Sequence, residues 1–415
     1  MERSSPEDQT MNISERVKKD CCGCSACMNS CPRDCIKMTP DKDGFLYPEV
    51  CEVLCVECNK CVKVCPVLNE DTPDNKPKAY LVRNKSKELR KTSTSGGFFA
   101  AAAKYVLSEG GVVFGVGFDE NFHVRHSYIE NLKEIKKFNR SKYVQSEVGH
   151  TYRKVKEFLA DGRKVLFSGT PCQVEALLNY LGNDPDDLYT MDIICKGVPS
   201  PKFWKKYLSW HKKKSGKDIR EVRFREKTYG YGSTTMRVVY SDGTEYDEPY
   251  DVDPMLQFYS KEMISRPSCY DCKSKGKHRR SSFTAGDYWY VSGAAPRMDD
   301  GIGVSQVLVN NEKAAAAFEE IKKYLDVEPL DFDKDSAING GMMVTSAKPN
   351  PRREEMFADL DGMSMSGLQK KYFPATFKLK NRIKRKIRPI MYNMGILKIY
   401  KKSMRKRQST KGSKR

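Results

Sequence analysis

The sequence contains little histidine and no long apolar run. Only five of its 415 residues are histidine, so zinc sites built from cysteine and histidine together have few ligands to draw on. No apolar run approaches the ~18–20 residues that a membrane-spanning helix needs. The first twenty residues are polar and mixed in charge, so we expect no secretory signal and a cytoplasmic location.

Acidic residues are missing from one segment only. Residues 370–415 contain 18 lysines and arginines and no aspartate or glutamate, whereas the rest of the chain carries 56 basic and 54 acidic groups. The net charge of +20 therefore belongs to a tail, and the high overall basicity does not by itself indicate nucleic-acid binding. With 39% apolar residues, the remainder is able to form a sizeable core.

Cysteine, in contrast, is abundant, with 15 residues. In a cytoplasmic chain, clustered cysteines indicate metal or redox chemistry more often than disulfides. The pattern Cys-x2-Cys-x2-Cys-x3-Cys-Pro begins at Cys21 and again at Cys55. This is the spacing of a bacterial ferredoxin with two [4Fe-4S] clusters, in which the fourth cysteine of each run ligates the other cluster. We therefore predict one cluster on Cys21, Cys24, Cys27 and Cys65, and another on Cys55, Cys58, Cys61 and Cys31.

The alternative for this repeat is a pair of zinc knuckles, which would not explain the third cysteine step or the Cys-Pro ending. Cys22, Cys35 and Cys51 fall outside the pattern and are not expected to be ligands. The domain organisation that we predict is a flexible amino terminus (1–16), a ferredoxin-like segment (17–70) with a hairpin turn at 41–44, a linker (71–78), an oxidoreductase body (79–350) and a basic tail (351–415).

The body alternates between strand and helix patterns, which predicts an α/β fold. We expect strands at 79–82, 112–118, 165–167, 188–194 and 304–309, helices at 98–107, 148–159, 174–181, 202–212 and 313–325, and a hairpin over 237–246. Four cysteines lie in this body, the number that one more cubane requires: Cys172, Cys195, Cys269 and Cys272. Cys172 and Cys195 follow predicted strands, where open α/β sheets place their sites. The alternative is two buried apolar cysteines and a zinc or redox pair at Cys269 and Cys272.

Several body motifs resemble the coenzyme F420 hydrogenase/dehydrogenase beta-subunit family. They are Phe-Ser-Gly-Thr-Pro-Cys-Gln at 167–173, Asp-Ile-Ile-Cys-Lys-Gly-Val-Pro-Ser at 192–200, the Cys269/Cys272 pair, Thr-Ala-Gly-Asp-Tyr-Trp at 284–289, and, nearer the amino terminus, 95–97 and 141–143. The resemblance implies an α/β (α+β) iron–sulfur flavoprotein that uses FAD and holds a third cluster on the four body cysteines. Lys196, Ser282 and Tyr290 depart from the pattern of the family.

The resemblance also implies where FAD would bind. A glycine pair that opens a helix can hold an anion at the helix amino terminus, so Ser95, Gly96 and Gly97 are candidates for the pyrophosphate. Lys142 and Tyr143 are candidates for contacts with the phosphate and the flavin ring. Ser168, Gly169, Thr170 and Asp287 complete the expected binding residues. The alternative is that the glycines serve packing, that Lys142 is solvated and that Asp287 caps a turn. No residue is assigned a catalytic role.

The tail alternates basic and apolar residues over 377–402. This pattern favours a helix packed on the body or lying on an anionic membrane surface at its inner face, with nucleic acid as the least favoured partner. For the whole chain we predict a flavin-dependent oxidoreductase that exchanges electrons between ferredoxin-type clusters and FAD. Its substrate would be the deazaflavin coenzyme F420 or another two-electron acceptor, and its partner a redox protein or a small molecule. The alternative is an electron-transfer subunit without its own substrate site.

Overall fold

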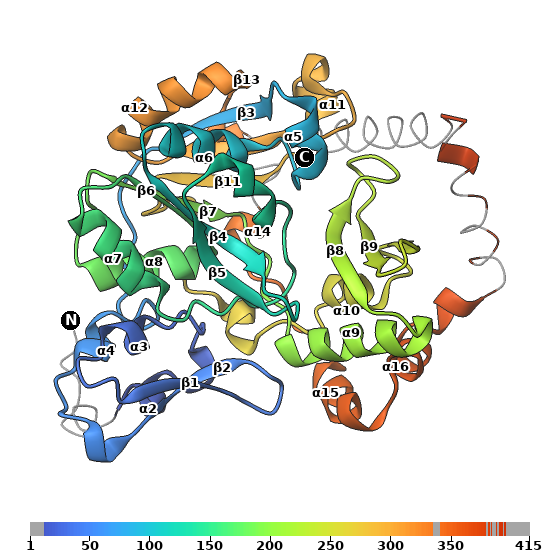
Figure 1. Cartoon of the computed structure of the whole chain (residues 1–415), viewed down its shortest axis with the longest axis horizontal. Helices are drawn as coiled ribbons and strands as arrows, with labels where there is room; N and C mark the ends of the chain where they lie inside the picture. Colours follow the sequence, from blue (N-terminus) through green and yellow to red (C-terminus); the bar gives the residue numbers. More distant parts are fainter. Residues whose placement is uncertain are drawn as a thin grey trace.

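The computed structural model describes residues 12–334 and 341–378, together with isolated positions between 381 and 395. Its centre is an eight-stranded sheet with the strand order β13-β3-β12-β11-β7-β6-β4-β5 (Figure 1). A three-stranded sheet, β10-β9-β8, and the hairpin β1-β2 flank it. The fold is therefore α/β, as predicted. Residues 1–11 and most of the predicted amphipathic tail lie outside the described residues, and so do the membrane and nucleic-acid predictions that depend on that tail.

The middle of the large sheet is parallel. Its four parallel strands are β4 (Val112–Phe118), β6 (Val165–Ser168), β7 (Leu188–Ile193) and β11 (Phe283–Asp287). Antiparallel strands complete both edges: β5 (Val124–Ile129) on one side, and β12 (Ser305–Val309), β3 (Lys78–Asn84) and β13 (Leu325–Leu330) on the other. The parallel strands are largely buried, as expected when helices cover both faces of a sheet.

Two helix pairs cover the two faces of this sheet. Val113 and Leu166 pack in one core with α6 (Phe98–Ser108) and α12 (Glu312–Ile321). Phe114 and Phe167, the next residues along the same strands, pack in another core with α7 (Thr151–Ala160) and α8 (Pro171–Leu181). Successive strand residues point to opposite faces, so the apolar runs at 112–118 and 165–168 supply both cores at once.

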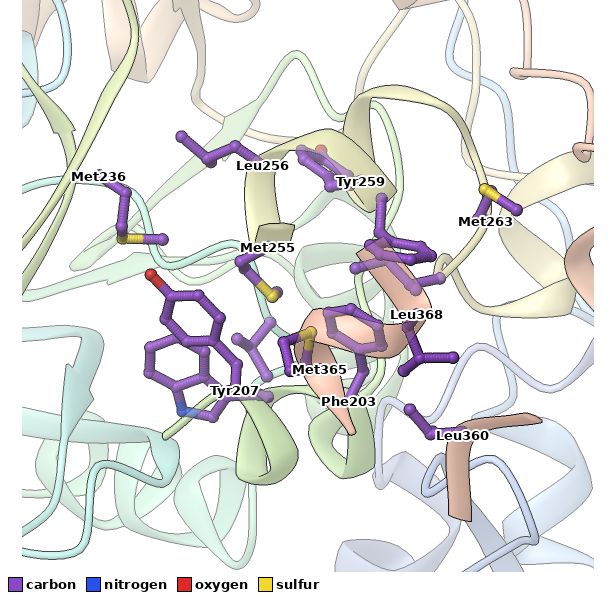
Figure 2. Close-up of a cluster of buried hydrophobic side chains, with 14 of the residues drawn as sticks. Phe203, Tyr207, Met236, Met255, Leu256, Tyr259, Met263, Leu360, Met365 and Leu368 are labelled. Atoms are coloured by element: carbon purple, nitrogen blue, oxygen red, sulfur yellow. The ribbon is translucent and has the colours of Figure 1, made fainter. Parts of the chain in front are cut away.

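A third core lies beside the sheet and is shown in Figure 2. It joins Phe203, Met255 and Leu368, among others, from elements that lie far apart in the chain. Those elements are α9 (Pro201–Ser215), β8 (Ile219–Glu226), β9 (Thr235–Tyr240), β10 (Glu245–Pro249), α10 (Pro254–Ser260), α15 (Arg353–Gly362) and α16 (Met365–Tyr372). Residues 353–372, which the sequence analysis placed in the tail, are thus part of this core, because Met356, Leu360 and Leu368 are buried in it.

Most of the predicted body elements are present within a few residues of their expected bounds, including the hairpin β9-β10. One prediction is wrong at its end. The helix expected over 313–325 stops at Ile321, because the chain from Leu325 onward forms β13 and pairs with β3. Shorter helices are α5 (Lys87–Thr92), α11 (Val291–Ala294) and α14 (Gly341–Val344). Within the described ranges, no helix has both the length and the apolar character needed to cross a bilayer.

The ferredoxin-like segment packs directly against the body, below α7 and α8 in Figure 1. It contains α3 (Ala26–Ser30), α4 (Lys60–Lys63) and the hairpin of β1 (Ile36–Pro40) and β2 (Leu46–Val50), whose turn is the one predicted. The helix α2 (Ile13–Val17) packs on the segment through the buried Ile13 and Val17, so the predicted flexible amino terminus (1–16) is wrong from Ile13 onward. The Arg153 Nε donates to the Asn29 carbonyl oxygen at 2.9 Å, and the Asn29 Nδ2 donates to the Gly149 carbonyl oxygen at 2.8 Å. Cys24 and Ala26 also belong to the core of α7 and α8. The segment is therefore held in one orientation.

Candidate functional site

The cysteines predicted to hold the first cluster come together, and we call them the inner site. Cys21 and Cys24 lie in the loop before α3, Cys27 lies in α3, and Cys65 follows α4; all four are buried. Burial raises the pKa of the Cys27 thiol, and the nearby Cys21 and Cys65 thiols raise it further. This mutual effect requires sulfur atoms that lie near one another, so the inner site is a single group of thiols.

The two cysteine repeats share an unusual backbone. Gly23 and Ser25 have φ angles of 70° and 64°, and the equivalent Glu57 and Asn59 have φ angles of 49° and 55°. Left-handed residues of this kind turn successive N–H groups inward and form concave anion sites, which many iron–sulfur clusters occupy. Glu57 and Asn59 adopt this conformation although they carry side chains, so the shared shape follows the cysteine spacing rather than the presence of glycine.

The second predicted set, Cys31, Cys55, Cys58 and Cys61, forms the outer site. Cys31 is buried, Cys55 and Cys61 are half-buried, and Cys58 is exposed. Burial raises the pKa of the Cys61 thiol, and Cys58 and Cys55 add to the rise. Cys35, which the repeat excludes, has its sulfur 3.3 Å from that of Cys31. Cys58 is the only exposed residue among the cysteines predicted as ligands.

Exposed apolar residues stand beside the outer-site cysteines in the chain. Val53, Leu54 and Val56 are 94%, 46% and 58% exposed, and they stand between Cys51 and Cys58 in the chain. Glu52 and Glu57, both exposed, border these side chains. An apolar patch with an acidic edge beside a cysteine set is a surface on which another protein can dock.

The four remaining cysteines that were predicted to be ligands converge around a cavity of about 40 Å³, and we call them the body site. Cys172 is the second residue of α8, and Cys195 follows β7, so both lie at the carboxyl ends of neighbouring parallel strands. Cys269 and Cys272 come from the 3₁₀ turn Pro267–Asp271 and the residue that follows it. Burial raises the pKa of the Cys195 thiol to about 12, and Cys172 and Cys272 contribute to the rise.

No three histidine, cysteine, aspartate or glutamate side chains of the described residues are placed to hold a single metal ion.

A fifth cysteine lines the cavity of the body site. Cys22 lines this cavity together with Cys172 of the body site, and it is close enough to Cys172 and to Cys24 of the inner site for these thiols to shift its pKa. It therefore stands between one thiol of each set. The sequence analysis excluded Cys22 because it breaks the repeat, and no sequence signal indicates this contact, which depends on how the ferredoxin-like segment packs against the body.

A larger cavity of about 370 Å³ adjoins the body site. Eight of the nine expected flavin-binding residues line it: Ser95, Gly97, Lys142, Tyr143, Ser168, Gly169, Thr170 and Asp287. Gly96 lies behind the wall, where a Cβ would be 2.4 Å from the Val82 carbonyl oxygen and 2.6 Å from the Ser305 nitrogen. A glycine at position 96 thus allows this loop to pack closely against β3 and β12. Cys195 lines both cavities, so the two adjoin.

The wall of the large cavity contains an ion pair that the sequence analysis missed. The Arg225 Nη1 donates to the Asp287 Oδ2 at 2.7 Å and to the Tyr143 hydroxyl at 3.0 Å. The Tyr231 hydroxyl donates to the Asp287 Oδ1 at 2.9 Å, and the Trp289 ring stacks on the Tyr231 ring at 4.9 Å. Arg225 is buried, and its Nη2 has no hydrogen-bond partner among the described residues. One N–H group of this charged side chain is therefore buried and unpaired in the wall of the cavity.

A bulge in β8 explains why Arg225 reaches this wall. The pairing of β8 with β9 shifts register between Arg223 and Glu226, and Arg225 has a φ of 58°. Such a bulge turns a side chain away from the regular alternation of its strand. The apolar alternation of Val222 and Phe224 marks a strand in the sequence, but nothing in the sequence marks the bulge.

Several other lining residues form hydrogen bonds or helix caps within the protein. The Ser95 hydroxyl donates to the Val304 carbonyl oxygen at 2.8 Å, and Gly97, with a φ of 83°, is the N-cap residue just before α6. The Thr170 N–H donates to the Gln173 Oε1 at 3.0 Å in the capping box of α8. The first N–H groups of α6 have no partner within the helix, so its amino terminus remains the attractive end for an anion.

Two lysines, Lys142 and Lys196, also line the cavity. The Lys142 Nζ donates to the Asn139 carbonyl oxygen at 2.9 Å. Burial, together with the nearby Arg140, lowers the pKa of Lys142 to about 7. Lys196, where the family resemblance leads one to expect histidine, forms an ion pair with Glu262 and lies 4.9 Å from the centre of the Tyr259 ring. Its charge is therefore balanced within the protein.

Comparison with known proteins gives one family. Residues 162–333 match the carboxy-terminal part of the coenzyme F420 hydrogenase/dehydrogenase beta-subunit family, a span that includes the four body-site cysteines and Asp287. A similar solved structure is a chain of the F420-reducing [NiFe] hydrogenase complex from Methanosarcina barkeri, determined after xenon derivatization. The identity is 15%, the match covers 72% of this chain and 91% of that chain, and the TM-score is 0.43. No curated protein matches the chain.

Proposed function

We propose that the protein is an iron–sulfur flavoprotein oxidoreductase, because residues 162–333 match the carboxy-terminal part of the coenzyme F420 hydrogenase/dehydrogenase beta-subunit family. It exchanges electrons between three [4Fe-4S] clusters and one FAD, and FAD serves coenzyme F420 or another two-electron acceptor. The observation that carries the proposal is the pair of adjoining cavities, one ringed by cysteines and one lined by cationic and aromatic groups, with Cys195 in the wall of both.

The three cysteine sets fit the clusters that we assign to them. The inner site would hold one cluster, the outer site a second and the body site a third. The inner cysteines are buried and the body cysteines are half-buried, and burial raises the pKa values of Cys27, Cys195 and Cys269. Groups of thiols that resist ionisation in this way are stable as thiolates only beside a strongly positive centre, which the iron of a cluster supplies.

The large cavity fits a flavin nucleotide. Its volume of about 370 Å³ lies within the usual range of cofactor sites, ~300–1,000 Å³. The amino terminus of α6 at Gly97 and the ammonium of Lys142 are suited to the pyrophosphate. The free Nη2 of Arg225 and the ring of Trp289 are suited to the polar edge and the face of the flavin ring. When bound, clusters exchange single electrons and FAD exchanges electrons in pairs.

The sites form a continuous series from the surface to the cofactor cavity. The outer site reaches solvent at Cys58, whereas Cys24 of the inner site packs in the core of α7 and α8. Cys22 joins the inner site to the body site, and Cys195 joins the body site to the cavity. We expect a protein partner to meet this series at the patch of Val53, Leu54 and Val56, and a small-molecule acceptor to meet it at the cavity.

Metal and flavin analysis of the anaerobically purified protein tests the proposal. Three cubanes predict about twelve iron and about twelve acid-labile sulfide per chain, together with about one FAD. A content of about eight iron would show that the body site holds no cluster. Zinc without sulfide would show that the assignment of all three clusters is wrong. A chain that holds three clusters but no flavin would instead be an electron-transfer subunit without its own substrate site.

A further inference from the structure

Arg266 is a fully buried arginine at the contact between the ferredoxin-like segment and the body. Its side chain has 0% exposure. The Nε donates to the Cys21 carbonyl oxygen at 2.7 Å, the Nη1 donates to the Gln145 Oε1 at 2.9 Å, and the Nη2 donates to the Leu46 carbonyl oxygen at 2.9 Å. The guanidinium also lies 4.2 Å from the centre of the Tyr47 ring. Arg266 thus reaches from the body into the loop that carries the inner-site cysteines.

The charge of Arg266 has no counter-charge within the described part of the chain. All three of its hydrogen-bond acceptors are neutral, and no carboxylate of the described residues forms an ion pair with it. A guanidinium remains protonated in proteins, and a buried charge is costly unless it is paired. The four other buried arginines of the described residues each have a carboxylate within 4 Å: Arg90, Arg225, Arg279 and Arg353.

We propose that the missing counter-charge of Arg266 is the inner cluster, and that Arg266 is a positioning residue that raises the reduction potential of this cluster. The proposal rests on the proposed function, because it requires a cluster at the inner site. Arg266 binds the carbonyl oxygen of Cys21, which is one of the inner ligands. It also lies so close to the cluster-binding loop that a Cβ on Gly23 would be 2.8 Å from its Nη1.

The direction of the effect follows from the charges. A [4Fe-4S] cluster with four thiolate ligands is anionic, and reduction adds one negative charge at the inner site. Net charge and burial are among the properties that set cluster potentials. A fixed cation in a buried environment stabilises the more negative, reduced state more than the oxidised state, so the loss of this cation should lower the potential.

The test compares Arg266→Gln, which removes the charge, with Arg266→Lys, which keeps it. The full-length protein is purified anaerobically, its iron is counted, and its cluster potentials are measured by redox titration followed by electron paramagnetic resonance. We expect Arg266→Gln to change the reduction equilibrium of one cluster at least tenfold, a lowering of about 59 mV for one electron, and to leave the other two unchanged. Arg266→Lys should retain most of the wild-type potential.

A matched control is Arg353→Gln. Arg353 also links the body to the ferredoxin-like segment, with its Nη2 3.3 Å from the Asp43 Oδ2, but its charge is already paired. We expect Arg353→Gln to leave all three potentials unchanged. If it shifts the same cluster as Arg266→Gln, the effect comes from the packing of the segment and the proposal is wrong.

The remaining outcomes also decide the question. Loss of about four iron in Arg266→Gln with retention in Arg266→Lys would support the proposal, because the charge would then be needed to keep the cluster. Equal effects of the two substitutions would overturn it, since the hydrogen bonds and not the charge would matter. A wild-type protein without iron would remove the proposed function itself. If three clusters are present and their potentials are the same in Arg266→Gln as in the wild type, only the role proposed for Arg266 is wrong.

Discussion

The ion pair of Arg225 and Asp287 offers a direct test of the cofactor cavity. In Arg225→Met the side chain keeps much of its length but loses its charge and its contacts with Asp287 and Tyr143. The Asp287 carboxylate then retains only the Tyr231 hydroxyl as a partner among the contacts described above. The cavity also loses the unpartnered Nη2, which we assign to the flavin.

Two magnitudes follow from these contacts. Removing one member of a buried ion pair typically costs about 3–5 kcal/mol, and because Asp287 is 18% exposed we expect the lower end, about 3 kcal/mol. For a domain of this size that corresponds to a fall of about 6 °C in Tm. Loss of one charged hydrogen bond to FAD, about 1.5–3 kcal/mol, should weaken FAD binding at least tenfold.

A matched control separates the two effects. Arg90 is also buried and also pairs with one carboxylate, Asp300, at 2.7 Å, but neither residue lines the cavity. Arg90→Met should lower Tm by a similar amount and leave FAD affinity unchanged. Calorimetry and fluorescence titration with FAD measure the two quantities on the anaerobic protein. Unchanged FAD affinity in Arg225→Met, or an equal loss in Arg90→Met, would refute the assignment of Arg225 to the flavin.

Three further predictions concern other residues of the sites. The pKa of Lys142, about 7, implies that this side chain loses its charge as pH rises above neutrality. FAD affinity should therefore fall between about pH 6 and about pH 8.5 in the wild type, and it should vary less in Lys142→Met. Identical pH profiles of the two proteins would argue against a contact between Lys142 and the phosphate. Cys172→Ser should lose about four iron while the outer and inner clusters persist. Cys22 lies beside Cys172 and could replace it as a ligand. This replacement would be indicated if Cys172→Ser kept all of its iron while the Cys22→Ser/Cys172→Ser double variant lost about four iron. Val56→Lys should slow reduction by ferredoxin-type partners but not by small dyes, and equal rates with both would place the docking surface elsewhere.

Local patterns explain what could be predicted from the sequence. The cysteine repeat predicted which thiols gather in the inner site, and the apolar runs predicted the strands, because both depend on residues close together in the chain. Cys172 and Cys195 could be predicted to converge since both follow strands of one parallel sheet.

The remaining features depend on contacts between distant parts of the chain. Arg266 lies 245 positions from Cys21, and nothing in the local sequence of either residue indicates their hydrogen bond. Arg225 reaches the cavity only because a bulge interrupts β8. The helices over residues 353–372 were assigned to the tail because a basic composition follows them, although their apolar side chains complete a core whose other members lie far earlier in the chain, such as Phe203.

The uneven burial of the three cysteine sets has a consequence for how the protein ages in air. Thiolate ligands are oxidised in the order in which oxidants reach them, and Cys58 is open to solvent while the inner ligands lie beneath the surface. In the proposed function, damage would therefore begin at the outer site and separate the molecule from its protein partner before it reached the flavin. An aged preparation should keep its yellow-brown colour and its reactivity toward dyes after it has stopped responding to its natural partner.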